Sequence, residues 1–188
     1  AVNGIIAGNF GASGQSCVAG SRVFIQKSIH SKILRKIKER AKAIIVGDPL
    51  DKKTQVGPLA TAHQVERAHD VIDKSLKQGA KIVFGGKRPE HLSEGWYFEP
   101  TLLDCPNQAI DCVSTELFAP VISAITFDTE EEAIKMANDS DFGLGAGVFT
   151  ENLARAHRVS QKIHSGIVWV NTYRAISPIS PFGGFKQS

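Results

Sequence analysis

Cys17 is the residue of this sequence best placed to do chemistry, because small residues surround it. Glycines occupy positions 8, 11, 14 and 20, and the segment then runs into the apolar residues 23–25. Small neighbours leave a thiol approachable, and glycine lets the backbone turn sharply or come close to a ligand. Since the thiolate is a strong nucleophile, this segment could support nucleophilic chemistry. From the composition of the segment alone, however, a buried structural thiol is the favoured interpretation, because free cysteines are among the most buried residues.

The other residue types that could do chemistry form weaker patterns. The six histidines include no pair with metal-ligand spacing and no Cys-x-x-Cys partner, so we expect no metal site. The glycine-rich segment 143–147 follows a helical pattern and precedes a strand pattern, which is the reverse of the order that a phosphate-binding turn needs. We interpret it as a turn that enters a strand.

The composition indicates one soluble globular domain. The chain has 188 residues, of which 42% are hydrophobic and 22% charged, with a net charge of +3. The basic excess comes largely from 27–42, where Lys and Arg alternate with apolar residues at helical spacing, as on a solvated helix face. We therefore expect no nucleic-acid partner. No apolar run approaches the roughly 18 residues of a membrane span, so we expect no membrane partner.

The cysteine and methionine content bears on the cellular location of the protein and on whether the sequence is part of a longer chain. Three cysteines are too few, and odd in number, for a disulfide framework, which favours a reducing, cytoplasmic location. The one methionine is Met136, so we expect the chain to be a piece of a longer protein.

Strand and helix patterns alternate along the chain. The predicted strands are 21–26, 81–84, an irregular extended piece at 95–103, 121–127, 145–149 and 166–170. The predicted helices are 28–46, 61–79, 129–138 and 152–163, and the end of the chain, 176–188, is expected to be an irregular loop. This alternation predicts an α/β fold, a three-layer α/β/α domain with a mostly parallel sheet, whose ligands gather at the carboxyl ends of strands.

Several motifs occur in a fixed order and carry a family resemblance. Residues 14–22, with Gly-Gln-Ser-Cys, resemble the catalytic cysteine segment of the aldehyde dehydrogenase superfamily. The family's other motifs match at Gly47-Asp48-Pro49, Gly57-Pro58-Leu59, Glu116 to Pro120, 138–150, Trp169-Val170-Asn171 and Ser180 to Lys186. The resemblance covers the whole chain. It implies that 1–188 is the catalytic domain, with the cofactor-binding domain and the oligomerisation segment outside this sequence.

The resemblance also implies a mechanism. Cys17 would attack an aldehyde to give a thiohemiacetal, a hydride would pass to NAD or NADP, and the resulting thioester would be hydrolysed. The backbone N–H of Cys17 is the local candidate for an oxyanion donor. The general base and the second oxyanion donor would lie outside the chain, so we expect the chain alone to be inactive as a dehydrogenase.

The cofactor-binding residues come from the same resemblance. Glu116 would hold the nicotinamide ribose and Phe118 would pack beside the nicotinamide ring. Gln64 and Arg67 would contact the adenosine ribose, and Leu144 would line the nicotinamide or aldehyde pocket. From the residues alone, Glu116 could be an exposed carboxylate beside a turn, Gln64 and Arg67 an ordinary solvated helix face, and Leu144 a core residue.

The substrate pocket would include residues on both sides of the cysteine and at the end of the chain: Ser16, Val18, Asn171, Ile176 and Phe182. Ile176 and Phe182 could equally be core residues, and Asn171 could order the loop after the last strand. Two departures from the family pattern are Ala119, where the family usually has Gly, and Ala12-Ser13 before the Gly-Gln pair.

Three questions stay open at this point. A semialdehyde dehydrogenase that transfers the acyl group to coenzyme A, and a non-catalytic structural member of the fold, are the alternative functions. The particular aldehyde, and the choice between NAD and NADP, would be decided outside this chain. The family's members imply a homodimer or a homotetramer.

Overall fold

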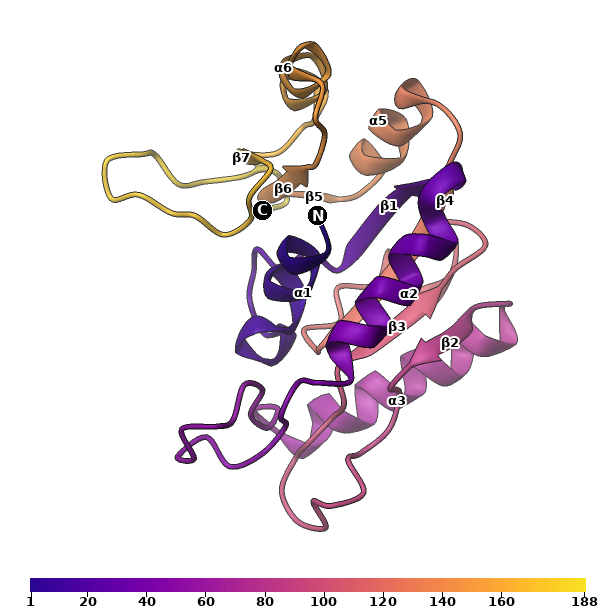
Figure 1. Ribbon diagram of the computed structural model, residues 1–188, viewed down its shortest axis with the longest axis vertical. Coiled ribbons are helices and arrows are strands. Elements are labelled where there is room, and N and C mark those ends of the chain that lie inside the picture. The colour runs from indigo at the N-terminus through magenta and orange to yellow at the C-terminus, as the bar shows by residue number, and fades with distance from the viewer.

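A four-stranded mixed sheet forms the centre of the computed structural model, which describes residues 1–188 (Figure 1). Its strands stand in the order β1-β4-β3-β2. Their bounds are Arg22–Gln26 for β1, Val121–Phe127 for β4, Thr101–Asp104 for β3 and Lys81–Phe84 for β2. β1 and β3 both pair with β4 in parallel, and β2 pairs with β3 in antiparallel. The predicted α/β class with a mostly parallel central sheet is confirmed.

Side chains of β4 alternate between two cores, as the period of two in a strand requires. Val121 and Ile125 belong to the core on one face, while Ile122 and Ala124 belong to the core on the other. Helices α1 (Val2–Phe10) and α2 (His30–Ala41) cover the second face, and α3 (Ala62–Lys77) and the short α4 (Asp111–Ser114) cover the first. The three predicted layers are therefore present.

Shorter strands form two further sheets beside this core. β6 (Gly145–Val148) and β7 (Ile167–Val170) pair in parallel, and α6 (Leu153–Lys162) lies between them in the sequence and connects them. β5 (Phe142–Gly143) pairs with β8 (Phe185–Lys186), which lies within the predicted irregular loop. The predicted alternation is thus divided among separate sheets, because β1 occupies the edge beside β4 and β6 pairs only with β7.

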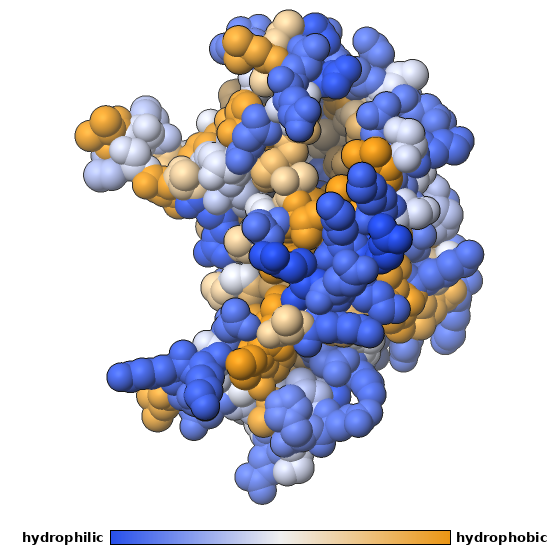
Figure 2. Space-filling model, in the orientation of Figure 1, coloured by the Kyte–Doolittle hydropathy of each residue, from blue (hydrophilic) through white to orange (hydrophobic).

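The basic helix is shorter than predicted. It ends at Ala41 instead of residue 46, and a single 3-10 turn, Lys27–Ile29, precedes it. Ile44 and Val46 leave the helix to pack into the core of α1 and α2, where Val46 forms a bridge to Val56. The polar face of α2 is exposed to solvent, as predicted, and Figure 2 shows hydrophilic atoms over it. No helix in the structure combines the length and the apolar character needed to cross a bilayer.

Three helices begin at polar side chains that cap them. Thr61, Thr129 and Asn152 accept hydrogen bonds from the backbone N–H three residues on, at 3.2, 3.2 and 2.8 Å. Such caps satisfy donors that the first helical turn leaves unpaired. The predicted starts of α3, α5 (Glu130–Asn138) and α6 agree with the structure within one residue.

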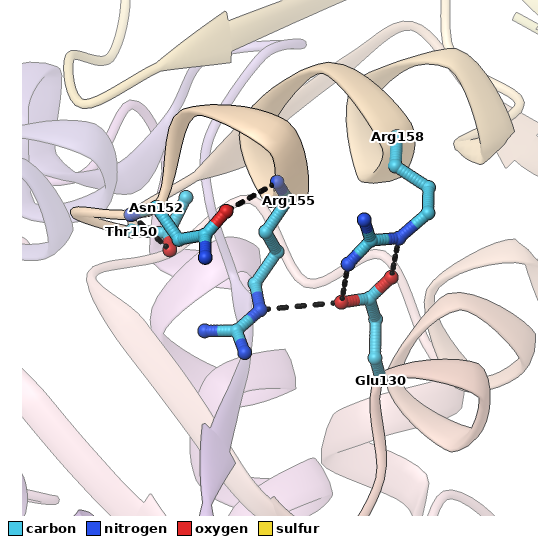
Figure 3. A network of polar contacts seen from close by, with 5 residues as sticks. All are labelled: Glu130, Thr150, Asn152, Arg155 and Arg158. Carbon is cyan, nitrogen blue, oxygen red and sulfur yellow. Dashed lines mark hydrogen bonds and ion pairs between the residues drawn. The ribbon is translucent and has the colours of Figure 1, made fainter.

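Glu130 ties α5 to α6 (Figure 3). Arg158 donates to both oxygens of Glu130, at 2.6 and 2.8 Å, and Arg155 donates to one of them at 3.2 Å. Hydrogen bonds from Arg158, and then from Arg155, lower the pKa of Glu130 to about 2. The carboxylate is therefore ionised at neutral pH, and it fixes the two helices beside the smaller sheets.

Candidate active site

Cys17 lies in the loop that joins α1 to β1, after a 3-10 turn at Gly11–Gly14. It is exposed, whereas Cys105 and Cys112 are buried. A buried structural thiol therefore does not describe Cys17. Its backbone N–H donates no hydrogen bond within the chain, so a hydrogen-bond donor is free beside the sulfur.

The turn before Cys17 has a left-handed backbone. Ala12, Ser13 and Gly14 have φ angles of 54°, 54° and 72°. A left-handed conformation costs about 1–2 kcal/mol at each residue that carries a side chain. Two hydrogen bonds to a neighbouring segment compensate: the Ser13 hydroxyl donates to the carbonyl of Gly57 at 2.9 Å, and the side-chain oxygen of Gln15 accepts from the N–H of Ala60 at 2.8 Å. Segment 57–60 thus fixes the cysteine loop.

The ring of Tyr173 explains two of the glycines. A methyl group at Gly8 or Gly20 would lie 2.9 or 3.2 Å from that ring. These glycines therefore let the backbone approach Tyr173, a residue of the chain itself, and not a ligand. Burial raises the pKa of Tyr173 to about 12. The sequence reasoning missed Tyr173, and the repeated glycines around Cys17 were the signal of a large side chain packed against them.

A cleft of about 800 Å³ separates the four-stranded sheet from the smaller sheets. Its walls come from α1, the cysteine loop, the edge strands β1 and β6, and the segment after α4. The predicted site residues that line it are Ser16, Cys17, Glu116, Phe118 and Leu144. The tertiary structure thus brings together residues that lie up to 128 positions apart in the sequence.

Glu116 differs from the other acidic residues of the cleft. Asp128 pairs with Lys27 at 3.5 Å, and Glu130 binds the arginines of α6. The carboxylate of Glu116 is exposed and has no hydrogen bond or ion pair. It is therefore free to accept hydrogen bonds from a ligand. No group of three His, Cys, Asp or Glu side chains gathers in the structure to hold a metal ion.

Arg22 forms part of the cleft wall, but its side chain is hydrogen-bonded within the chain. Its guanidinium donates to the carbonyls of Met136, Ala137 and Asp139, at 3.3, 3.0 and 3.1 Å. These carbonyls lie at the end of α5, where helical partners run out. Burial lowers the pKa of Arg22, and the nearby Asp139 opposes this shift.

Gln64 and Arg67 do not line the cleft. The Gln64 side chain donates to the carbonyls of Leu117 and Phe118, both at 2.9 Å, and Arg67 donates to the carbonyl of Glu116 at 2.8 Å. The hydrogen-bond partners of Gln64 and Arg67 therefore lie in the segment that carries Glu116. The two side chains are not simply a solvated helix face.

The four remaining predicted residues lie outside the main cleft. Val18 is buried and packs towards Gly145. Asn171 exchanges two hydrogen bonds with the backbone of Thr150, at 3.0 and 2.9 Å, so it orders the loop after β7. Ile176 and Phe182 line a separate hollow of about 240 Å³ beneath the loop between β7 and β8. They are 61% and 50% exposed, so neither is a core residue.

Comparison with known proteins shows which proteins this chain is similar to. The model of the aldehyde dehydrogenase family matches residues 1–188. The chain is 49% identical over its full length to a (Z)-2-((N-methylformamido)methylene)-5-hydroxybutyrolactone dehydrogenase of Acinetobacter baylyi, of which it covers 38%. It is 43% identical to a betaine aldehyde dehydrogenase of Rhizobium etli, of which it covers 39%. The chain therefore spans less than two fifths of the length of these relatives.

Solved structures agree with the fold. An NAD+ complex of aldehyde dehydrogenase from Bacillus cereus superposes with a TM-score of 0.95, at 36% identity, over 99% of this chain and 38% of that one. A Staphylococcus aureus betaine aldehyde dehydrogenase in complex with NAD+ gives a TM-score of 0.96, also at 36% identity, over 99% of this chain and 37% of that one. The full-length family match, the identity of the relatives and the shared fold agree, and the chain belongs to the aldehyde dehydrogenase family.

Proposed function

We propose that this chain is the catalytic domain of an NAD- or NADP-dependent aldehyde dehydrogenase, which oxidises an aldehyde to a carboxylic acid. The observation that carries the proposal is that Cys17, the one exposed thiol, opens onto the same cleft as Glu116 and Phe118. The NAD+ complexes of the Bacillus and Staphylococcus enzymes support the choice of cofactor.

Cys17 is the nucleophile of this proposal. Its thiolate attacks the carbonyl carbon of the aldehyde, and the carbonyl oxygen becomes an oxyanion in a thiohemiacetal. The unpaired N–H of Cys17 is available to stabilise that oxyanion. Bound NAD or NADP would supply the hydride acceptor for this carbon. The acyl group is then held on the sulfur as a thioester until water hydrolyses it and frees the thiolate.

Glu116 and Phe118 suit the nicotinamide half of the cofactor. The Glu116 carboxylate has no partner within the chain and can accept hydrogen bonds from both ribose hydroxyls. The Phe118 ring lines the same wall and offers an apolar surface to the nicotinamide. Ser16 and Leu144 complete the part of the cleft around Cys17.

The general base and the second oxyanion donor are proposed to come from outside this chain. The chain covers 38% of its Acinetobacter relative, so most of such an enzyme lies elsewhere. We therefore expect no dehydrogenase turnover from the chain alone. We also propose a homodimer or a homotetramer for the full-length protein, which sedimentation would distinguish.

The test compares the chain alone with a chimera in which this chain replaces the equivalent part of the Acinetobacter relative. Betaine aldehyde is the first substrate to try, because several relatives are named for it. The chimera should form NADH with an aldehyde, while the chain alone and the Cys17→Ala chimera should not. Robust turnover by the chain alone would refute the proposal that the general base lies outside it. Turnover by the Cys17→Ala chimera would refute the proposal that Cys17 is the nucleophile. Formation of acyl-coenzyme A when coenzyme A is added would favour the acylating alternative.

A further inference from the structure

Two side chains on one face of α3 bind three consecutive carbonyls. Gln64 Nε2 donates to the carbonyls of Leu117 and Phe118, both at 2.9 Å. Arg67 Nη2 donates to the carbonyl of Glu116 at 2.8 Å. Residues three apart on a helix lie on the same face. All three carbonyls of segment 116–118 are therefore bound from α3.

The helix is a firm support for these two side chains. Its first turn is capped by Thr61, which accepts from the N–H of Gln64 itself at 3.2 Å. Ala68, next to Arg67, is fully buried in the core beneath the sheet. A glutamine amide has two N–H donors, and both are used on carbonyls of the segment. The amide of Gln64 therefore has no donor left for a ligand.

Segment 116–118 needs such support. Phe118 has a φ of 51°, a left-handed conformation that is rare for an aromatic residue. Leu117 points into the core with 5% exposure, while Glu116 and Phe118 on either side of it line the cleft. The carbonyls are bound by α3, and the carboxylate of Glu116 is left without a partner. The backbone contacts thus orient both cleft residues without occupying either side chain.

We propose that Gln64 and Arg67 are positioning residues for the reaction. They hold the carbonyls of segment 116–118, and so they fix the Glu116 carboxylate and the Phe118 ring for the nicotinamide ribose and ring. This role rests on the proposed function, and it replaces a direct contact of Gln64 and Arg67 with the adenosine ribose. Neither residue touches the reacting atoms.

The kinetic test uses the chimera described above. Arg67→Met and Gln64→Leu remove the donors while keeping much of the side-chain volume. Each should raise the KM for NAD by about 10-fold, with kcat and the KM for the aldehyde changed by less than about 2-fold. Arg67→Lys keeps a cationic N–H donor group and should recover part of the loss. Glu66→Gln, on the exposed side of α3, is the matched control and should leave every constant unchanged.

A second arm separates positioning from direct contact. Nicotinamide mononucleotide contains the nicotinamide ribose but no adenosine. If Arg67 acts through Glu116, Arg67→Met should lose about the same 10-fold in kcat/KM with the mononucleotide as with NAD. A loss seen with NAD alone would overturn the proposal in favour of a contact with the adenosine ribose.

A third arm does not depend on activity. Amide hydrogen exchange of residues 114–120 should be faster in Arg67→Met and Gln64→Leu than in Glu66→Gln, while exchange within α3 should be unchanged. If the unsubstituted chimera shows no turnover, the proposed function fails, and exchange still reports on the contacts. If turnover is present and neither KM nor exchange changes, the positioning role alone is wrong.

Discussion

Gly14 lies directly against the carbonyl group of Ala119. A methyl group at position 14 would come 2.0 Å from that oxygen and 2.2 Å from the carbonyl carbon. This contact joins the cysteine loop to the segment that carries Glu116 and Phe118. The two halves of the candidate site are therefore set against each other by backbone, with no side chain between them.

Gly14→Ala should destabilise the protein strongly. The φ of 72° strains any other residue, and the added methyl group has no space, so we expect a loss of about 3 kcal/mol. In a thermal unfolding experiment the midpoint should fall by about 6–12 °C for a chain of this size. Gly183→Ala is the control, because a methyl group there meets nothing within 4 Å. Equal midpoints for the two variants would contradict the contact.

A limiting amount of iodoacetamide should modify Cys17 before the other two cysteines. Cys17 is exposed, whereas Cys105 and Cys112 are each 4% exposed. Peptide mass spectrometry after a short reaction would give the order. All three should react at similar rates in concentrated urea, which is the control for intrinsic reactivity. Earlier modification of Cys105 or Cys112 in the folded chain would count against Cys17 as the accessible thiol.

Arg22→Met should loosen α5 from the central sheet. Methionine fills much of the same volume but leaves the carbonyls of Met136, Ala137 and Asp139 without their donor. The carbonyls of Met136 and Ala137 are partly buried, so the loss of their partner is costly, and we expect a loss of about 2–3 kcal/mol in urea unfolding. The stability of Arg22→Lys should lie between that of the parent chain and that of Arg22→Met, since one ammonium cannot reach all three oxygens. Arg35→Met, on the exposed face of α2, should have little effect.

Glu130 should make stability depend on pH in the acid range. Its pKa in the folded protein is about 2, below its usual 4.5, so the stabilisation is fully present above pH 4.5. It is lost as the pH falls from 4.5 towards 2, because the unfolded chain takes up the proton first. Comparison of Glu130→Gln with the parent chain by thermal unfolding at pH 7 and at pH 3 checks this. The difference between them should shrink at pH 3, and Glu131→Gln should show no such change.

Local patterns in the sequence determined much of the fold and the position of the candidate nucleophile. The starts of α3, α5 and α6 could be predicted because a capping side chain and its partner lie three residues apart. The strand at 81–84 has the predicted bounds. The small residues around Cys17 indicated an accessible thiol, and the ordered motifs indicated the family.

Elements that depend on distant contacts could not be predicted. The helix α1 contains Gly4 and Gly8, which are poor helix formers, and it is secured by the burial of Phe10 in the core beside α2. The early end of α2 has the same origin, because Ile44 and Val46 reach that core only by leaving the helix.

The sequence by itself determined which residue types are present and which local segments they favour, because caps, strand alternation and the cysteine loop act over a few residues. The tertiary structure decided what those residues touch. Gln64 meets Leu117 across 53 positions, and Arg67 meets Glu116 across 49. Spacing along the chain carries no information about such a pair, since the packing of α3 and the sheet brings its members together. This is why the sequence could not show that Gln64 and Arg67 bind the segment that carries Glu116.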